Sequence, residues 1–191
     1  MIAAEKCLLV LLAAGRSERF GAEDKLAADF LGRPLASHVA TALEAVPFMA
    51  RVAITSDTAL DFAAMGYRVV RNPAPEAGLS GSVRLGAHAA QQAGAAALVI
   101  ALADMPRVTA TQIVRLLDAT QGANDVIASS DGVRPSPPAL FGAGRFAELG
   151  ALSGEEGARA LIRSGRHIVT HPAELIDIDT PEDLAALRAL A

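Results

Sequence analysis

Short apolar runs alternate with segments of helical periodicity over the first two thirds of the chain. Polar residues, Gly or Pro bound these runs, as they bound the strands of a sheet. The predicted strands are residues 7–12, 51–57, 67–71, 96–102 and 125–128. The predicted helices are residues 35–46, 58–65, 82–93 and a segment that Thr109 caps. This alternation predicts an α/β fold in which helices cover both faces of a parallel sheet.

The regular alternation of predicted strands and helices ends after Ser130. Residues 131–138 contain three prolines and predict a stiff loop, and the apolar residues 139–141 follow. Two short helices at 145–149 and 156–164 and a strand at 167–170 come next, and Thr180 with Pro181 marks the start of a last helix. The chain shows no repeat, linker or low-complexity segment, so its 191 residues predict one domain.

Composition narrows the function classes. A net charge of −4 argues against a nucleic-acid binder, which should be basic. The single cysteine, Cys7, lies in a predicted buried strand and indicates a core thiol. The apolar run of the first strand is too short to cross a bilayer and leads directly into a charged loop, so we expect a cytoplasmic protein without a membrane partner.

The loop after the first strand is the strongest candidate for chemistry. Residues 7–12 are apolar throughout, and Gly15 and then Arg16, Arg19 and Lys25 follow. Small residues leave backbone N–H groups open to an anion, and three cations favour a polyphosphate. The alternative is an ordinary strand-to-helix turn with a solvated basic face. Residues 72–82 predict a second anion site, at the start of a helix that Ser80 or Ser82 caps.

Acidic residues are expected at the same edge of the sheet, since ligands bind beyond the carboxyl ends of parallel strands. Asp104 follows a very apolar strand, and Asp177 and Asp179 precede the last helix. A carboxylate that faces a phosphate loop suits a Mg²⁺ ion that bridges phosphate oxygens. The alternative for each acid is a turn or helix-capping role. The four histidines lack zinc-ligand spacing, and GxSxG, GxGxxG and the true P-loop pattern are absent.

In these motifs and their order, the sequence resembles the MobA-like nucleotidyltransferases and, within them, the MocA-type molybdenum cofactor cytidylyltransferases. The resemblance covers nearly the whole chain in the family's order. The segments that carry it are residues 12–21 with Lys25, 78–86, 103–106, 154–159 and 177–184. It implies a three-layer α/β/α Rossmann-like fold with a mostly parallel sheet. Two departures lie in the half expected to recognise the acceptor: Ser136-Pro137-Pro138 stands where the family often has Gly-His-Pro, and Glu155 stands where Asp is usual.

The resemblance also implies roles for individual residues. Backbone groups of Leu12, Ala13, Ala14 and Gly15 would hold the nucleotide, and Lys25 would contact its phosphates. Asn72 would lie near the ribose, Ser82 would belong to the nucleotide-binding loop, and Asp104 would bind Mg²⁺. Ala14 stands where guanylyl-transferring relatives tend to carry glycine, which favours CTP.

These features predict transfer of a nucleoside monophosphate, with CTP the favoured donor, to a phosphate on a molybdopterin-type acceptor, for which a molybdoenzyme is a possible partner. Mg²⁺ on Asp104 and Asp179, together with Lys25 and Arg19, would neutralise the charge that develops on the phosphates. Two alternatives remain: transfer to another phosphorylated small molecule such as a sugar or polyol phosphate, and a non-catalytic accessory protein that binds the cofactor.

Overall fold

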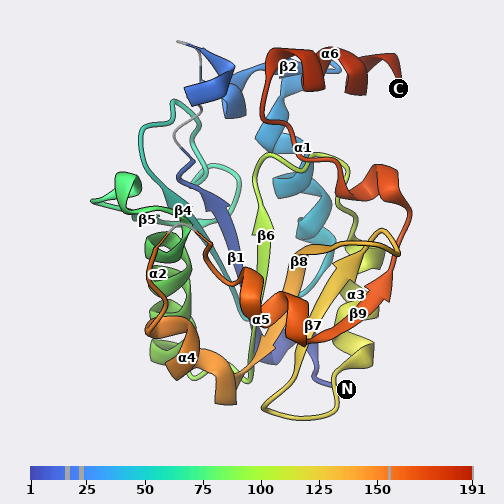
Figure 1. Ribbon diagram of the computed structural model, residues 1–191. Coiled ribbons are helices and arrows are strands. Elements are labelled where there is room, and N and C mark those ends of the chain that lie inside the picture. The colour runs from blue at the N-terminus through green and yellow to red at the C-terminus, as the bar shows by residue number, and fades with distance from the viewer. Residues whose placement is uncertain (16–17, 22–23, 155, 191) are drawn as a thin grey trace.

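A seven-stranded sheet forms the centre of the computed structural model, which describes residues 1–15, 18–21, 24–154 and 156–190 (Figure 1). Its order is β5-β4-β1-β6-β8-β7-β9. Only β8 runs antiparallel to its neighbours, and the other paired strands of this sheet are parallel. The strands are β1 Cys7–Ala13, β4 Ala50–Thr55, β5 Arg68–Arg71, β6 Ala97–Leu102, β7 Val126–Ser130, β8 Pro135–Gly142 and β9 Arg166–Val169.

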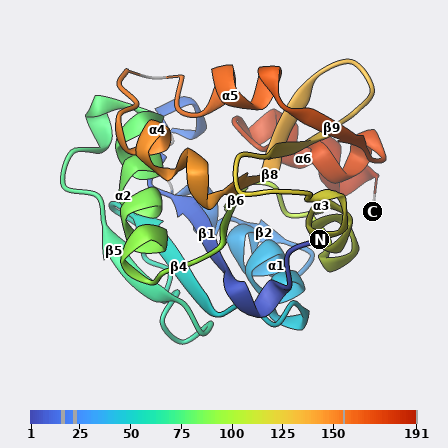
Figure 2. The same ribbon diagram turned by 90° about the horizontal axis from the view of Figure 1, so that it is seen from below.

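Helices cover both faces of this sheet, and the predicted three-layer architecture is confirmed (Figure 2). One face carries α1 and α3, and the other carries α2, α4 and α5. The helices are α1 Leu35–Ala42, α2 Leu79–Gln92, α3 Ala110–Ala119, α4 Phe146–Gly150, α5 Arg159–Ser164 and α6 Pro181–Ala189. No helix in the described ranges is long and apolar enough to cross a membrane.

Strand β1 is buried along its whole length because it contributes to a core on each face. Leu9 and Leu11 pack into the core beneath α1 and α3, and Leu8 and Val10 pack into the core beneath α2, α4 and α5. Helix α2 approaches so closely that a Cβ on Gly86 would lie 3.1 Å from both methyl carbons of Val10. The prediction that this strand is buried is therefore confirmed.

Two local predictions were wrong. Residues 58–65 do not form a helix: residues 58–61 have no regular structure and residues 62–66 form turns, with Asp61 Oδ1 accepting a hydrogen bond from the Ala64 N–H. Residues 135–138 belong to β8 and were not expected in a strand. Within the described part of the chain β8 pairs with β6 only from Ala139 onward, so its prolines interrupt no pairing with β6; on the other edge, the pairing of β8 with β7 shifts register between Ala128 and Ser129. The stretch 176–179, which carries Asp177 and Asp179, has no regular secondary structure and leads into α6.

A separate apolar cluster joins the loop after β1 to the C-terminal segment. We call it the end cluster; its members are Phe20, Phe30, Leu35, Ile178, Leu184 and Leu187. It packs α6 against the hairpin of β2 Asp29–Phe30 and β3 Arg33–Pro34, at the top of the sheet in Figure 1. The predicted cap of α6 is confirmed: Thr180 Oγ1 accepts from the Asp183 N–H at 3.1 Å, and Asp183 Oδ2 accepts from the Thr180 N–H at 2.8 Å.

Candidate functional site

The candidate site lies where β1 and β6 end side by side. Leu12 pairs with Leu102, and the Ala103 N–H donates to the Leu12 carbonyl at 3.0 Å, so the segments that follow the two strands begin at the same level. Strand β1 has β4 on one side and β6 on the other, and the sheet is built outward from it in both directions. Such a switch in strand order opens a crevice at the carboxyl edge of the sheet.

Four charged side chains meet in this crevice. Lys25 Nζ lies 2.8 Å from Asp104 Oδ2 and 3.4 Å from Asp179 Oδ1. Arg19 Nη2 lies 2.7 Å from Asp179 Oδ2. The structure therefore brings together the predicted phosphate-binding cations and both predicted metal-binding acids. The Lys25 side chain is 7% exposed and the Arg19 side chain is 72% exposed. Packing therefore restrains Lys25 much more than Arg19.

A short 3₁₀ helix, Lys25–Ala27, positions the lysine. Asp24 caps it: Asp24 Oδ1 accepts from the Leu26 N–H at 3.0 Å, and its Oδ2 accepts from the Thr58 hydroxyl at 2.6 Å. Leu26 is buried in the core on the α1 side. The lysine therefore projects from an anchored turn, although it follows a loop.

Asp104 has an unusual environment for a carboxylate. Its Oδ1 is shielded from solvent and has no hydrogen-bond partner among the described residues. Burial raises the pKa of this carboxyl, the Lys25 ammonium opposes the rise, and the Asp177 and Asp179 carboxylates add to it. The Ile178 N–H donates to the Asp104 backbone carbonyl at 3.0 Å, which ties the C-terminal segment to the end of β6.

A cavity of about 510 Å³ occupies the crevice. Leu12, Ala14, Gly15, Arg19, Lys25, Ser82, Asp104 and Asp179 are the predicted site residues that line it. Ala13 does not line the cavity, because its side chain packs into the core on the α1 side. Asp177, which the sequence left undecided between a ligand and a capping role, lines the same cavity.

Asn72 lies behind the cavity wall. Its Nδ2 donates to Ser82 Oγ at 3.0 Å, and its Oδ1 accepts from the Ala74 N–H at 3.0 Å. It lines a neighbouring hollow, so its contacts orient Ser82 and the loop ahead of α2. The predicted serine cap of α2 was wrong, because the N-cap is Gly78, with φ of +86°, and both Ser80 and Ser82 lie inside the helix.

These residues fit a divalent cation. The unpartnered Asp104 Oδ1 is an anionic oxygen without a proton donor, and Asp177 and Asp179 face the same space. The described residues contain no group of three or more His, Cys, Asp or Glu side chains arranged to hold a metal. One or two carboxylates completed by phosphate oxygens is the arrangement that Mg²⁺ usually adopts with nucleotides.

The sequence assigned no role to Arg159, which also lines the cavity. The only signal for it was its place at the end of the 154–159 segment. Arg16, a predicted phosphate-binding cation, and Glu155, a departure from the family pattern, lie outside the described residues.

The fold and this site are those of a nucleotidyltransferase, and residues 9–170 match the MobA-like NTP transferase domain, so the chain belongs to that family. It is 33% identical over 187 residues to a molybdenum cofactor guanylyltransferase from Cereibacter sphaeroides, with 95% of each chain covered. It is 32% identical over 197 residues to the purine catabolism protein PucB of Bacillus subtilis, with 94% of each chain covered.

Solved structures share the fold. The crystal structure of Rv0371c from Mycobacterium tuberculosis superposes with a TM-score of 0.79 at 22% identity, covering 96% of this chain and 98% of that one. Another structure of that mycobacterial protein, described as a complex with manganese, superposes with a TM-score of 0.75 at 22% identity, covering 97% of this chain and 99% of that one.

Proposed function

We propose that residues 1–191 act as one domain that transfers a nucleoside monophosphate from an NTP to a phosphate on an acceptor and releases pyrophosphate. The observation that carries the proposal is the contact of Lys25 Nζ with Asp104 Oδ2 at 2.8 Å in a shared cavity. A cation from the loop after β1 and an acid from the end of β6 meet where a polyphosphate and a metal ion need opposite charges.

The reaction needs no side-chain nucleophile. An oxygen of the acceptor phosphate, already ionised at neutral pH, attacks the α-phosphorus, and the bond from that phosphorus to the bridging oxygen of the β-phosphate breaks. The electron pair leaves with pyrophosphate. Lys25 and Arg19 would neutralise charge on the phosphates, and backbone groups of residues 12–15 would hold the nucleotide. Catalysis of this kind rests on positioning and electrostatic stabilisation.

Asp104 and Asp179 would hold the cation, with Mg²⁺ as the proposed ion. The unpartnered Oδ1 of Asp104 supports this assignment, and so does the manganese complex of the mycobacterial protein. A bound divalent cation supplies positive charge to the phosphate oxygens. Lys25 contacts the same two carboxylates, so we expect it to move toward the phosphates when the cation and the nucleotide enter.

CTP is the proposed donor, because the methyl group of Ala14 takes up space in the cavity where the resemblance places the nucleotide. GTP is a second candidate, which the guanylyltransferase from Cereibacter sphaeroides supports at 33% identity. Replacing Ala14 with Gly removes the methyl group and should lower any preference for CTP over GTP.

A molybdopterin-type phosphate is the proposed acceptor, and that relative's name supports it. A sugar or polyol phosphate is the alternative acceptor, and a binding-only accessory of a molybdoenzyme is the alternative function. We propose a cytoplasmic location, where NTPs are available. Retention of both Lys25 and Asp104 favours an enzyme, because a binding protein has no need of a carboxylate that holds a metal.

Thermal denaturation with CTP, GTP, ATP or UTP, each with and without Mg²⁺, tests the donor. A nucleotide at about 100 times its Kd should stabilise the fold by about 2.7 kcal/mol, which raises Tm by about 5–10 °C for a chain of this length. Asp104→Ala should abolish pyrophosphate release, whereas Asp118→Ala, on the exposed side of α3, should not. Unchanged turnover by Asp104→Ala would remove the proposed metal site.

A further inference from the structure

A second hollow of about 330 Å³ opens beside the nucleotide cavity. It lies where β6 and β8 part: their pairing runs as far as Ile100 and Ala139, and the proline segment of β8 then leaves Leu102 uncovered. Ile100, Leu102, Pro137 and Phe141 contribute an apolar surface. A volume of this size is within the range of pockets that hold small molecules.

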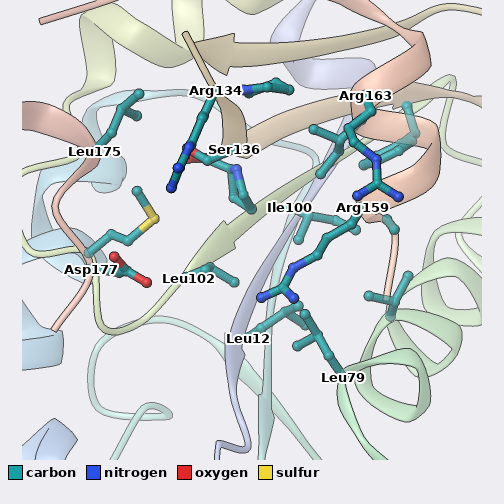
Figure 3. A pocket seen from close by; sticks show the side chains of 17 residues that line it. Leu12, Leu79, Ile100, Leu102, Arg134, Ser136, Arg159, Arg163, Leu175 and Asp177 are labelled. Atoms are coloured by element: carbon teal, nitrogen blue, oxygen red, sulfur yellow. The ribbon is translucent and has the colours of Figure 1, made fainter. Parts of the chain in front are cut away.

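Three arginines surround this apolar surface. Arg134 comes from the loop before β8, and Arg159 and Arg163 stand one turn apart on α5. Figure 3 shows their side chains directed into the hollow from different sides. Among the described residues that line the hollow, Asp177 is the one carboxylate, in a chain whose net charge is −4. Positive charge is therefore concentrated here against the overall balance of the protein.

Side chains in the described ranges neutralise little of this charge. No described carboxylate lies within ion-pair distance of Arg134 or Arg159. Arg163 reaches Glu156 at 3.5 Å, but both side chains are more than half exposed, and such pairs are weak. Guanidinium groups bind carboxylates and phosphates with paired hydrogen bonds.

The two cavities adjoin, and the residues that they share separate the roles of the arginines. Arg159 and Asp177 line both cavities, as do Leu12, Leu79 and Leu102, whereas Arg134 and Arg163 line only the second. Arg159 is thus placed where an acceptor phosphate would meet the nucleotide. Arg134 and Arg163 lie outside the nucleotide cavity and remain available to another anionic group.

We infer that the acceptor carries a second anionic group besides the attacking phosphate, and that Arg134 and Arg163 bind it. This inference rests on the proposed nucleotidyl transfer. A phosphate monoester that carries a second acidic group therefore fits this hollow, and a polyol phosphate without such a group does not.

Two small molecules with one aromatic body test the inference by calorimetry, without turnover. Phenyl phosphate carries one anionic group, and 4-carboxyphenyl phosphate carries two. We expect the wild-type protein to bind the second about tenfold more tightly or better, as charge-assisted hydrogen bonds do. Arg134→Gln and Arg163→Gln should each reduce that ratio and leave phenyl phosphate binding unchanged. Arg145→Gln, an arginine that pairs with Glu148 outside both cavities, should keep the ratio.

Three results would overturn the inference: equal binding of the two compounds by the wild-type protein, equal weakening of both by the Arg134 and Arg163 variants, or no binding of either at millimolar concentration. The Tm shift with Mg²⁺ and NTP is recorded on each variant. Its absence in the wild-type protein refutes the proposed function, whereas a normal shift with no preference for 4-carboxyphenyl phosphate refutes only the second anion site.

Discussion

Replacing Lys25 with Met removes the ammonium group that lies 2.8 Å from Asp104 Oδ2 and 3.4 Å from Asp179 Oδ1. Methionine keeps much of the length of the side chain, so the packing of the short helix at residues 25–27 is largely preserved. Asp104 then remains with a shielded oxygen and with two neighbouring acids that raise its pKa. We expect a loss of stability that depends on pH.

The magnitude follows from how far this pair is buried. Removing one partner of a buried ion pair costs about 3–5 kcal/mol, because the other charge stays desolvated. The Asp104 side chain is 23% exposed, and its carboxyl can take up a proton, so we expect the low end, about 3 kcal/mol near pH 8. For a chain of this length that lowers Tm by about 6–12 °C.

The sign of the pH dependence comes from Asp104. Its pKa in the folded protein is raised above the value of 3.8 that it has in an open chain. A raised carboxyl pKa gives stability that is fully present below the unfolded value and is lost as pH rises through the folded value. Lys25 opposes the rise, so its removal enlarges this loss. The variant should approach the wild-type protein as pH falls toward 3.8 and fall behind it as pH increases.

Urea unfolding at pH 5, 6.5 and 8, followed by circular dichroism, measures the difference in the free energy of unfolding. Arg19→Met is the matched control, because its side chain is 72% exposed and its pair with Asp179 should contribute less than about 1 kcal/mol. An equal loss for Lys25→Met at pH 5 and pH 8 would refute the electrostatic reasoning, and so would an equal loss for the two variants.

Three further predictions concern stability and are read from Tm. Leu31, exposed at φ of +52° ahead of Gly32, should gain about 0.5–1 kcal/mol as Leu31→Asn; a loss would show that the leucine makes a contact of its own. Thr180→Ala should cost about 1 kcal/mol by removing the cap of α6, and Thr180→Ser should restore it. Gly142→Ala would place a Cβ 2.3 Å from the Ala123 carbonyl oxygen and should cost about 3 kcal/mol or more, whereas Gly122→Ala, which meets nothing within 4 Å, should be close to neutral.

The sequence predicted the sheet well because long apolar runs have few alternatives to burial. Residues 7–12 and 96–102 are strands in the structure, and Asp104 faces the loop that carries Lys25 because both follow neighbouring strands. The wrong predictions fell where local signals depend on neighbours. Three prolines indicated a loop at 135–138, but proline breaks a strand only where a partner needs its N–H group, and β8 no longer pairs with β6 at these positions.

Contacts between distant segments were beyond the reach of local patterns. Arg19 and Asp179 form an ion pair although they are 160 positions apart, and the sequence of neither segment indicates this contact. For the same reason, the sequence did not single out the arginines of the second hollow. Arg134 lay in a predicted loop, and Arg163 lay in a short helix. Both arginines line the hollow that opens where the pairing of β6 with β8 ends.

The pairing of Lys25 with Asp179 also bears on how the protein is made. The two residues are 154 positions apart, and the end cluster that holds their segments together draws Ile178, Leu184 and Leu187 from the final stretch of the described chain. A nascent polypeptide that has reached residue 170 therefore contains Lys25 and Asp104 but has neither the second acid nor the apolar side chains that pack against Phe20 and Phe30. Affinity for nucleotide should accordingly appear only after α6 has emerged from the ribosome.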